Sequence, residues 1–241
     1  MSRDLLSYIF CVAFPLAMLV IMTLVNESIP KEAGMTIFRI DNLSGGVAVF
    51  GQTFVMLFTA LSVSKDRSGS FLIRLFASPM KSSDFTNGYI FPMLLISVIQ
   101  SCLTMAVSFI ISLIVGFDLN VLGLLVSICV LIPTAVFFIS IGLIFGTLFN
   151  QNAAPGLCSI IISLGSFIGG IWFDAESTGG IILKIAKCLP FIYCTKFVRC
   201  AVKLDFGKDF FLSGAVVLLC AVFFTVLSSL LFKTKMKADL Q

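Results

Sequence analysis

Hydrophobic positions along the chain gather into six long apolar stretches that are separated by short polar segments. A helix rises about 1.5 Å per residue, so about 20 apolar residues cross a hydrocarbon layer of about 30 Å. The stretches that reach about this length are 5–25, 46–63, 89–115, 121–148, 155–173 and 210–232. Their continuous apolar runs favour helices over barrel strands, in which apolar and polar residues alternate. The pattern predicts an all-α polytopic membrane protein, with residues 1–241 forming a single transmembrane domain of six helices.

Composition supports a membrane protein and removes several classes of function. The chain is 59% hydrophobic and 12% charged, with a mean hydropathy of +1.13, whereas soluble domains carry about 25% charged residues. The sequence contains no histidine, which excludes a Ser/His or HExxH protease centre. It also lacks a G-x-x-x-x-G-K-[ST] phosphate loop. We therefore expect no catalytic residues, no metal site and no cofactor in this chain, and no nucleic-acid partner.

Basic residues outside the apolar stretches bear on orientation. With the N-terminus inside, eight basic residues lie in inner segments and eight in outer segments, so the count over the whole chain is a tie. The tie comes almost entirely from 174–209. If that segment is set aside as long and partly structured, the count becomes eight inside against two outside. The positive-inside rule then predicts both termini in the cytoplasm of a multi-pass protein of the cell membrane.

The most polar part of the chain lies between the second and third apolar stretches, at residues 64–84. Apolar side chains recur there at spacings of three and four, which predicts a short amphipathic helix that Pro79 terminates, with overall bounds of 68–80. One interpretation is a helix lying on lipid headgroups. A second is a knob that docks into a partner protein through apolar anchors with a charged rim. The anchors would be Phe71, Leu75 and Phe76, and the rim Asp66, Arg67 and Arg74.

This segment resembles the first cytoplasmic loop of the membrane subunits of type-2 ATP-binding-cassette (ABC) exporters, which reads approximately E-x-E-x-G-[TF]-L-x-R-L-L-A-[TS]-P. Asp66 stands at the first acid and Ser70 at the glycine, while Ser68 replaces the second acid. The residues that then match the loop are Phe71, Leu72, Ile73, Arg74, Leu75, Phe76, Ala77, Ser78 and Pro79. The resemblance implies that 68–80 is a coupling helix on which a separate cytoplasmic ATPase docks.

Two further segments resemble the same family. Residues 163–173 look like the fifth span, which ends in glycine followed by an aromatic pair. Residues 183–199 look like the external segment, in which Pro190 precedes Arg199 by nine residues. The resemblance implies re-entrant external helices, here expected at 180–205. Such helices would explain the basic residues that obscure the orientation count.

The family also implies a mechanism and its partners. Two permease subunits, identical or different, face each other in the lipid bilayer, and two ATPase subunits that carry ATP and Mg²⁺ drive them. The second and fifth spans would line the pathway, with candidates Gln52, Met56 and Thr59 on one and Ser159, Ser163 and Ser166 on the other. Small and hydroxylated side chains also mediate helix packing in lipid, so packing is the alternative role for both sets. The motifs Gly142-x-x-x-Gly146 and Gly165-x-x-x-Gly169 likewise permit close helix approach.

Two competing classes of function are compatible with the same apolar pattern. An ATP-independent carrier or channel would also be polytopic, and so would a scaffold that transports nothing. The predicted spans contain no deep charge of the kind that ion-coupled carriers use, which favours an amphipathic cargo such as a drug, a lipid or an antimicrobial peptide.

Two local features of the sequence also allow more than one interpretation. The first apolar stretch could be a signal peptide rather than a span, although no small-x-small cleavage site follows it. Cys188, Cys194 and Cys200 precede the last span, where free thiols or a disulfide are both compatible with the spacing.

Overall fold

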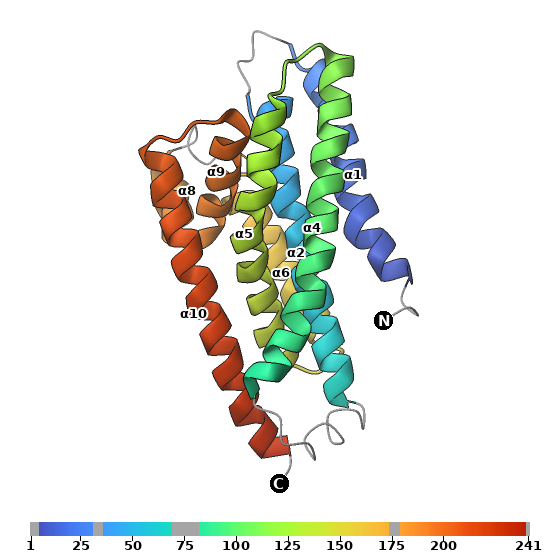
Figure 1. The fold of residues 1–241 in the computed structure, drawn as a ribbon, viewed down its shortest axis with the longest axis vertical. Coiled ribbons are helices and arrows are strands. Elements are labelled where there is room, and N and C mark those ends of the chain that lie inside the picture. The colour runs from blue at the N-terminus through green and yellow to red at the C-terminus, as the bar shows by residue number, and fades with distance from the viewer. Residues whose placement is uncertain (1–4, 31–35, 69–81, 174–178, 240–241) are drawn as a thin grey trace.

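The computed structural model describes residues 5–30, 36–68, 82–173 and 179–239, and these residues form helices joined by short connections without strands. This confirms the predicted all-α fold. The helices are α1 (Leu5–Ser28), α2 (Ile40–Ser68), α4 (Ser82–Val115), α5 (Val121–Leu148), α6 (Ala154–Ile168), α8 (Gly180–Cys188), α9 (Pro190–Lys203) and α10 (Lys208–Asp239). Figure 1 shows the long helices side by side as one bundle.

Among the described residues, five helices are long and apolar enough to cross a membrane: α1, α2, α4, α5 and α10. The fifth predicted span, 155–173, is shorter than expected, because α6 has only 15 residues. At about 1.5 Å per residue, α6 extends about 22 Å, less than a hydrocarbon layer of about 30 Å. The chain is thus a multi-pass membrane protein, whose described residues include five full-length apolar helices and the shorter α6.

Helices α2 and α5 form the centre of the bundle. In the most apolar 18-residue segment of α2, 72% of the residues are buried inside the chain, against 22% in the corresponding segment of α10. Helix α5 packs most extensively against α2 and α10. Because lipid accepts apolar side chains as readily as the interior does, outer helices such as α10 can leave large hydrophobic residues exposed, among them Leu219 and Phe223.

Close packing between α2 and α5 depends on two glycines of α5. A Cβ atom at Gly146 would lie 2.7 Å from the carbonyl oxygen of Ala60, and one at Gly142 would lie 2.9 Å from Cβ of Thr59. Neither distance leaves room for a methyl group. The G-x-x-x-G motif at 142–146 therefore brings the backbones of α2 and α5 of the same chain together.

A helical hairpin, α8–α9, precedes the last long helix. Pro190 begins α9, where its missing N–H costs nothing because the first helical amides have no partner inside the helix. Before the hairpin, Gly170 has a φ of +75°, a conformation that glycine adopts without strain. The hairpin occupies most of the expected external segment, 180–205, and lies beside α10 in the upper half of Figure 1.

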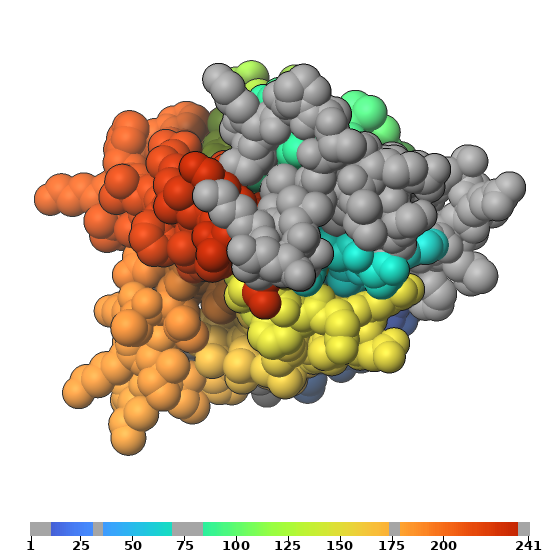
Figure 2. Space-filling view, turned by 90° about the horizontal axis from the view of Figure 1, so that it is seen from below, coloured from blue at the N-terminus to red at the C-terminus, as the bar shows by residue number. Residues whose placement is uncertain are grey.

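We call the end of the bundle at which α2 begins the outer end, and the end at which α2 terminates the inner end. Figure 1 shows that α10 also terminates at the inner end, that α4 begins there, and that α1 starts in the same half of the bundle. Seen from the inner end in Figure 2, the end of α2 (cyan) and the start of α6 (yellow) reach the surface. The helices that flank residues 69–81 thus meet at one face.

Candidate functional site

At the inner end, an arginine in the last turn of α2 binds the end of α5. Nη1 of Arg67 donates to the carbonyl oxygens of Gly146 at 3.2 Å and Phe149 at 3.5 Å, and also to that of Thr147. The last four carbonyls of a helix have no amide partner within it and carry partial negative charge. A guanidinium suits this position because it presents several donors in a fixed plane. Arg67 therefore caps α5.

The residue before Arg67 connects α2 to α4. The hydroxyl of Tyr89 donates to Oδ2 of Asp66 at 2.7 Å. A carboxylate near a helix C-terminus is disfavoured by the helix dipole, so a donor from another helix offsets part of this cost. Tyr89 lies in the second turn of α4, and the bond therefore fixes the start of α4 against the end of α2.

Together these contacts form the inner collar, which we define as Asp66, Arg67, Tyr89 and the carbonyls of Gly146, Thr147 and Phe149. The inner collar ties the helices on both sides of 69–81 to each other and to α5. The sequence placed Asp66 and Arg67 on the rim of a docking knob, and the structure gives both side chains partners within the chain. The remaining predicted docking residues lie outside the described residues: Ser70, Phe71, Leu72, Arg74, Leu75, Phe76 and Pro79. Ser68, where the predicted coupling helix begins, is the last residue of α2.

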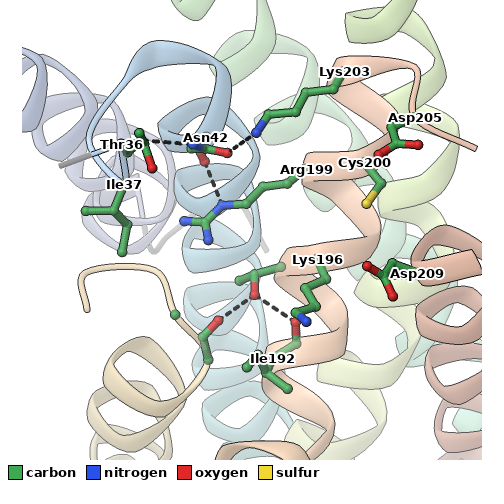
Figure 3. Close-up of a pocket in the computed structure, with 13 residues that line it drawn as sticks. Thr36, Ile37, Asn42, Ile192, Lys196, Arg199, Cys200, Lys203, Asp205 and Asp209 are labelled. Carbon is green, nitrogen blue, oxygen red and sulfur yellow. Dashed lines mark hydrogen bonds between the residues drawn. The ribbon is translucent and has the colours of Figure 1, made fainter. Parts of the chain in front are cut away.

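At the outer end, α9 is attached to the first turn of α2. Nε of Arg199 donates to the carbonyl oxygen of Asn42 at 2.9 Å, and Nζ of Lys203 donates to Oδ1 of the same residue at 2.6 Å. A Cβ atom at Gly46 would lie 3.1 Å from Nη2 of Arg199, so this glycine allows the guanidinium to lie close against α2. Figure 3 shows both side chains reaching from α9 to Asn42.

A carboxylate compensates for the basic residues at this end. Asp41 accepts from Nε and Nη2 of Arg39 at 2.7 and 2.6 Å, and its Oδ2 lies 3.6 Å from Nζ of Lys203. The hydrogen bond to Asp41 raises the pKa of Arg39. The Arg39 guanidinium also lies 5.5 Å from the centre of the Phe117 ring, a cation–π distance. The start of α2 is thereby connected to α9 and to the turn between α4 and α5.

A comparison with protein families now decides what kind of bundle this is. The model of the ABC-2 type transporter family matches residues 1–203, which run from the N-terminus to the end of α9. The chain belongs to the ABC-2 type transporter family. A search of curated proteins finds no match. The family resemblance that the sequence predicted is confirmed, and the chain is a membrane transport component.

In this ABC-2 protein, the pathway candidates on α2 lie inside the bundle. Gln52, Met56 and Thr59 are each fully buried. Nε2 of Gln52 donates to the carbonyl oxygen of Leu131 in α5 at 2.9 Å, and Thr59 lies against Gly142. Burial within the bundle and the contacts of Gln52 and Thr59 are what packing within the chain would produce. To line a pathway, α2 would have to separate from α5, so that role remains a prediction.

The candidates on α6 differ from one another in exposure. Ser159 and Ser163 are exposed, whereas Ser166 is buried. The hydroxyls of Ser159 and Ser166 donate to their own helix, at Pro155 and Ile162. The exposed face of α6 is consequently available to a second subunit or to cargo, and lining the pathway stays a prediction for these residues also.

Sequence reasoning missed several residues of these two ends. Tyr89 was interpreted only as the start of a span, and Asn42 and Lys203 were not singled out. It also missed a buried polar stripe on α4, whose spacing of three and four along an apolar helix would have revealed it. The stripe consists of Ser97, Gln100, Ser101, Thr104, Ser108 and Ser112.

The cysteines of the external segment are free thiols. Cys188 is exposed and Cys194 is fully buried in α9. Burial raises the pKa of the Cys194 thiol. Burial also raises the pKa of Cys200, with further contributions from the carboxylates of Asp205 and Asp209. Of the two states that the spacing allowed, the structure has free thiols.

Proposed function

We propose that this chain is the permease subunit of an ATP-driven ABC-2 exporter. A separate cytoplasmic ATPase, present in two copies in the complex, would dock on the segment 68–80. The support is the family match over residues 1–203 together with the inner collar, which connects both flanks of 69–81 to α5. The chain lacks a phosphate loop, so ATP and Mg²⁺ belong to the partner. The inner end would then face the cytoplasm, with both termini on that side of the cell membrane.

The inner collar suggests how a docked ATPase moves the permease. A force on 69–81 acts on the end of α2 and the start of α4, which the bond between Tyr89 and Asp66 holds together. Arg67 passes the motion to the end of α5. Helix α5 is in turn joined to α10 by a hydrogen bond of 2.8 Å between the hydroxyls of Ser140 and Thr225. The central helices would respond as one body because packed interiors transmit displacement rather than absorb it.

A second permease subunit, identical or different, would complete the pathway. The outward face of α6 supports this arrangement, because it exposes Ser159 and Ser163 next to the large apolar residues Ile160 and Leu164. A mixed surface of this kind suits an amphipathic cargo such as a drug, a lipid or an antimicrobial peptide, which presents both polar and apolar groups. Membrane lipid covers the remaining apolar exterior.

The docking step is tested by co-purification. The tagged chain is isolated from its native membranes, and attached ATPases are identified by mass spectrometry through their phosphate-loop peptides. Phe71→Asp or Leu75→Asp places a charge on a predicted apolar anchor, so we expect each variant to lose the ATPase while still inserting in the membrane. Ile182→Asp makes the same chemical change on exposed α8 at the outer end, and it should retain the ATPase.

Two results would contradict the proposal. One is that both Phe71→Asp and Leu75→Asp keep the ATPase and continue to transport cargo. A second is that the purified chain, reconstituted without any ATPase, exports cargo at the rate of the complex. That second result would establish an ATP-independent carrier or channel.

A further inference from the structure

A pocket of about 310 Å³ opens at the outer end, between the start of α2, the end of α6 and one face of α9. Its lining contains several polar and charged side chains. Five charged side chains line it, namely Lys196, Arg199, Lys203, Asp205 and Asp209. We call this cavity the outer pocket.

Positive charge lies along one side of the outer pocket. Lys196, Arg199 and Lys203 occupy positions i, i+3 and i+7 of α9, so they share one helical face. Arg199 and Lys203 are held in place by their bonds to Asn42. The start of α2 adds the partial positive charge of a helix N-terminus. An anionic group with several oxygen acceptors, such as a phosphate diester, matches this side of the pocket.

Negative charge lies on another side. Asp205 is in the turn after α9 and Asp209 is in the first turn of α10, and Figure 3 shows both carboxylates beyond Cys200, away from Asn42. The two carboxylates also act on the Cys200 thiol. Burial is the main reason why the pKa of Cys200 is raised, and the negative charges of Asp205 and Asp209 raise it further. A simple anion would be repelled from this side. The separation of charges selects a ligand that carries an anionic and a cationic group a short distance apart.

The surroundings indicate that the ligand is a lipid. Exposed apolar residues lie beside the pocket lining at the start of α10, where Phe211 and Leu212 follow Asp209 by two and three positions. An acyl chain could lie along these side chains in the outer leaflet while its headgroup enters the pocket. A primary ammonium can donate hydrogen bonds to aspartate, whereas a quaternary ammonium cannot.

We propose that the outer pocket binds the headgroup of a phosphatidylethanolamine, with its phosphate on Lys196 and Arg199 and its ammonium on Asp205 and Asp209. Such a lipid would bridge α9 and the start of α10 at the side of the bundle opposite the ATPases. Its recognition depends on charge geometry at the outer end and is independent of the docking proposed at the inner end.

A tryptophan beside the pocket provides the measurement. Trp172, the single tryptophan of the chain, packs against Phe50 of α2, so it is replaced by phenylalanine, and Phe211→Trp introduces a tryptophan where the acyl chain would lie. The full chain is reconstituted in phosphatidylcholine vesicles that contain a small fraction of a lipid with brominated acyl chains, which quench tryptophan on contact. Brominated phosphatidylethanolamine should reach half-maximal quenching at a mole fraction about tenfold lower than brominated phosphatidylcholine or phosphatidylglycerol, as expected for one charge-assisted hydrogen bond pair.

Variants locate the effect. Lys196→Gln and Asp209→Asn should each abolish the preference for phosphatidylethanolamine, whereas Lys184→Gln, which removes an exposed charge of α8 outside the pocket, should preserve it. The emission spectrum of the introduced tryptophan in each variant shows whether its surroundings are unchanged. Soluble glycerophosphoethanolamine should compete with the brominated lipid, and inorganic phosphate should not.

The proposal is overturned if the three brominated lipids quench equally, or if the preference survives both variants in the lining. Stronger quenching by phosphatidylglycerol would show that the pocket responds to negative charge alone. Competition by inorganic phosphate at the same concentration as glycerophosphoethanolamine would show that the aspartates take no part. If Lys196→Gln or Asp209→Asn alters the emission spectrum, competition by glycerophosphoethanolamine on the unmodified chain decides the matter.

Discussion

The two ends of α2 are held by the same kind of contact in opposite electrostatic settings. At the inner end, Arg67 meets the carbonyl end of α5, where the helix dipole favours a cation. At the outer end, Arg199 and Lys203 meet the amide end of α2, where the dipole disfavours a cation. The outer contact therefore requires Asp41 as a counter-charge, whereas the inner contact to the α5 carbonyls is favourable without one.

From this difference we infer that the inner end of α2 is held stiffly, whereas the charge balance at its outer end can be adjusted by a ligand. The inner collar joins three long helices through a guanidinium and a partly buried phenol, at the place where a docked ATPase would push. The outer end has three basic side chains on one face of α9, partly exposed ion pairs and a pocket in which a ligand can change the charge balance. Motion delivered at the inner end would reach the outer end along α2 and α5, because their backbones are in close contact at Gly142 and Gly146. Four substitutions test this contrast, beginning with the largest effect.

Removing the guanidinium of Arg67 should have the largest effect. Arg67→Met keeps much of the aliphatic length but leaves the carbonyls of Gly146, Thr147 and Phe149 without their donor. We expect the free energy of unfolding in detergent to fall by about 2 kcal/mol, the range of a hydrogen bond to a charged group. We also expect ATP and vanadate to stop changing hydrogen exchange at 143–153 in the permease–ATPase complex, although the ATPase still co-purifies.

Lys233→Met is the matched control, because it removes a positive charge near the inner end of α10, where the side chain is exposed. It should leave both the unfolding free energy and the exchange response near those of the unmodified chain. An Arg67→Met complex that still changes exchange at 143–153 on trapping would show that force does not pass through Arg67.

At the outer end, loss of Arg199 should loosen α9 rather than the whole bundle. Arg199→Met removes the bond to Asn42, and we expect a loss of about 1.5 kcal/mol, the low end of the range for a hydrogen bond to a charged group, because one carbonyl rather than three loses its donor. The local consequence is measurable at Cys194, which is fully buried in α9. Its rate of reaction with a maleimide, followed by mass spectrometry, should rise relative to that of exposed Cys188. Equal rates in variant and parent would mean that Asn42 does not anchor α9.

Tyr89→Phe should have a smaller effect than Arg67→Met at the same end. The change removes one hydroxyl donor to Asp66, worth about 1 kcal/mol in a partly exposed site. Tyr193→Phe removes a comparable bond, from an exposed hydroxyl to the carbonyl of Lys187, and its effect should be near zero. If Tyr89→Phe also unfolds as the parent does and leaves the exchange response unchanged, the bond to Asp66 plays no part in the inner collar.

The sequence predicts the architecture well because lipid imposes a simple rule. Long apolar stretches must become helices when no water can satisfy the backbone, so α5 has its predicted bounds and α4 ends where predicted, although α4 begins at Ser82 rather than at Tyr89. The predicted end of the span at 155–173 was wrong, because glycines can end a helix even where the sequence stays apolar. Residues 155–173 are apolar enough to span, yet the helix ends at Ile168, before Gly169 and the positive φ of Gly170.

The candidate site was harder to predict, because its partners are far apart in the chain. Asp66 and Arg67 could be recognised as a charged pair beside a docking segment, but the carbonyls of α5 that bind Arg67 lie about 80 positions away. Backbone carbonyls have no residue type, so no sequence pattern identifies them as partners. Gln52 was recognised as a polar residue within a span, and only the structure shows that it binds Leu131.

The smallest expected effect belongs to Lys203, and it tests whether the outer end is adjustable. Lys203 is exposed and lies 3.6 Å from Asp41, so solvent and salt screen the pair. Lys203→Gln should lower the free energy of unfolding by at most about 0.5 kcal/mol at low salt, and the difference should vanish near 1 M salt. The cost of Arg67→Met should persist at that salt concentration, because its guanidinium is partly buried against carbonyls. Should both variants lose their effects in salt to the same degree, the two ends of α2 would be electrostatically equivalent, and the contrast between a stiff and an adjustable end would not hold.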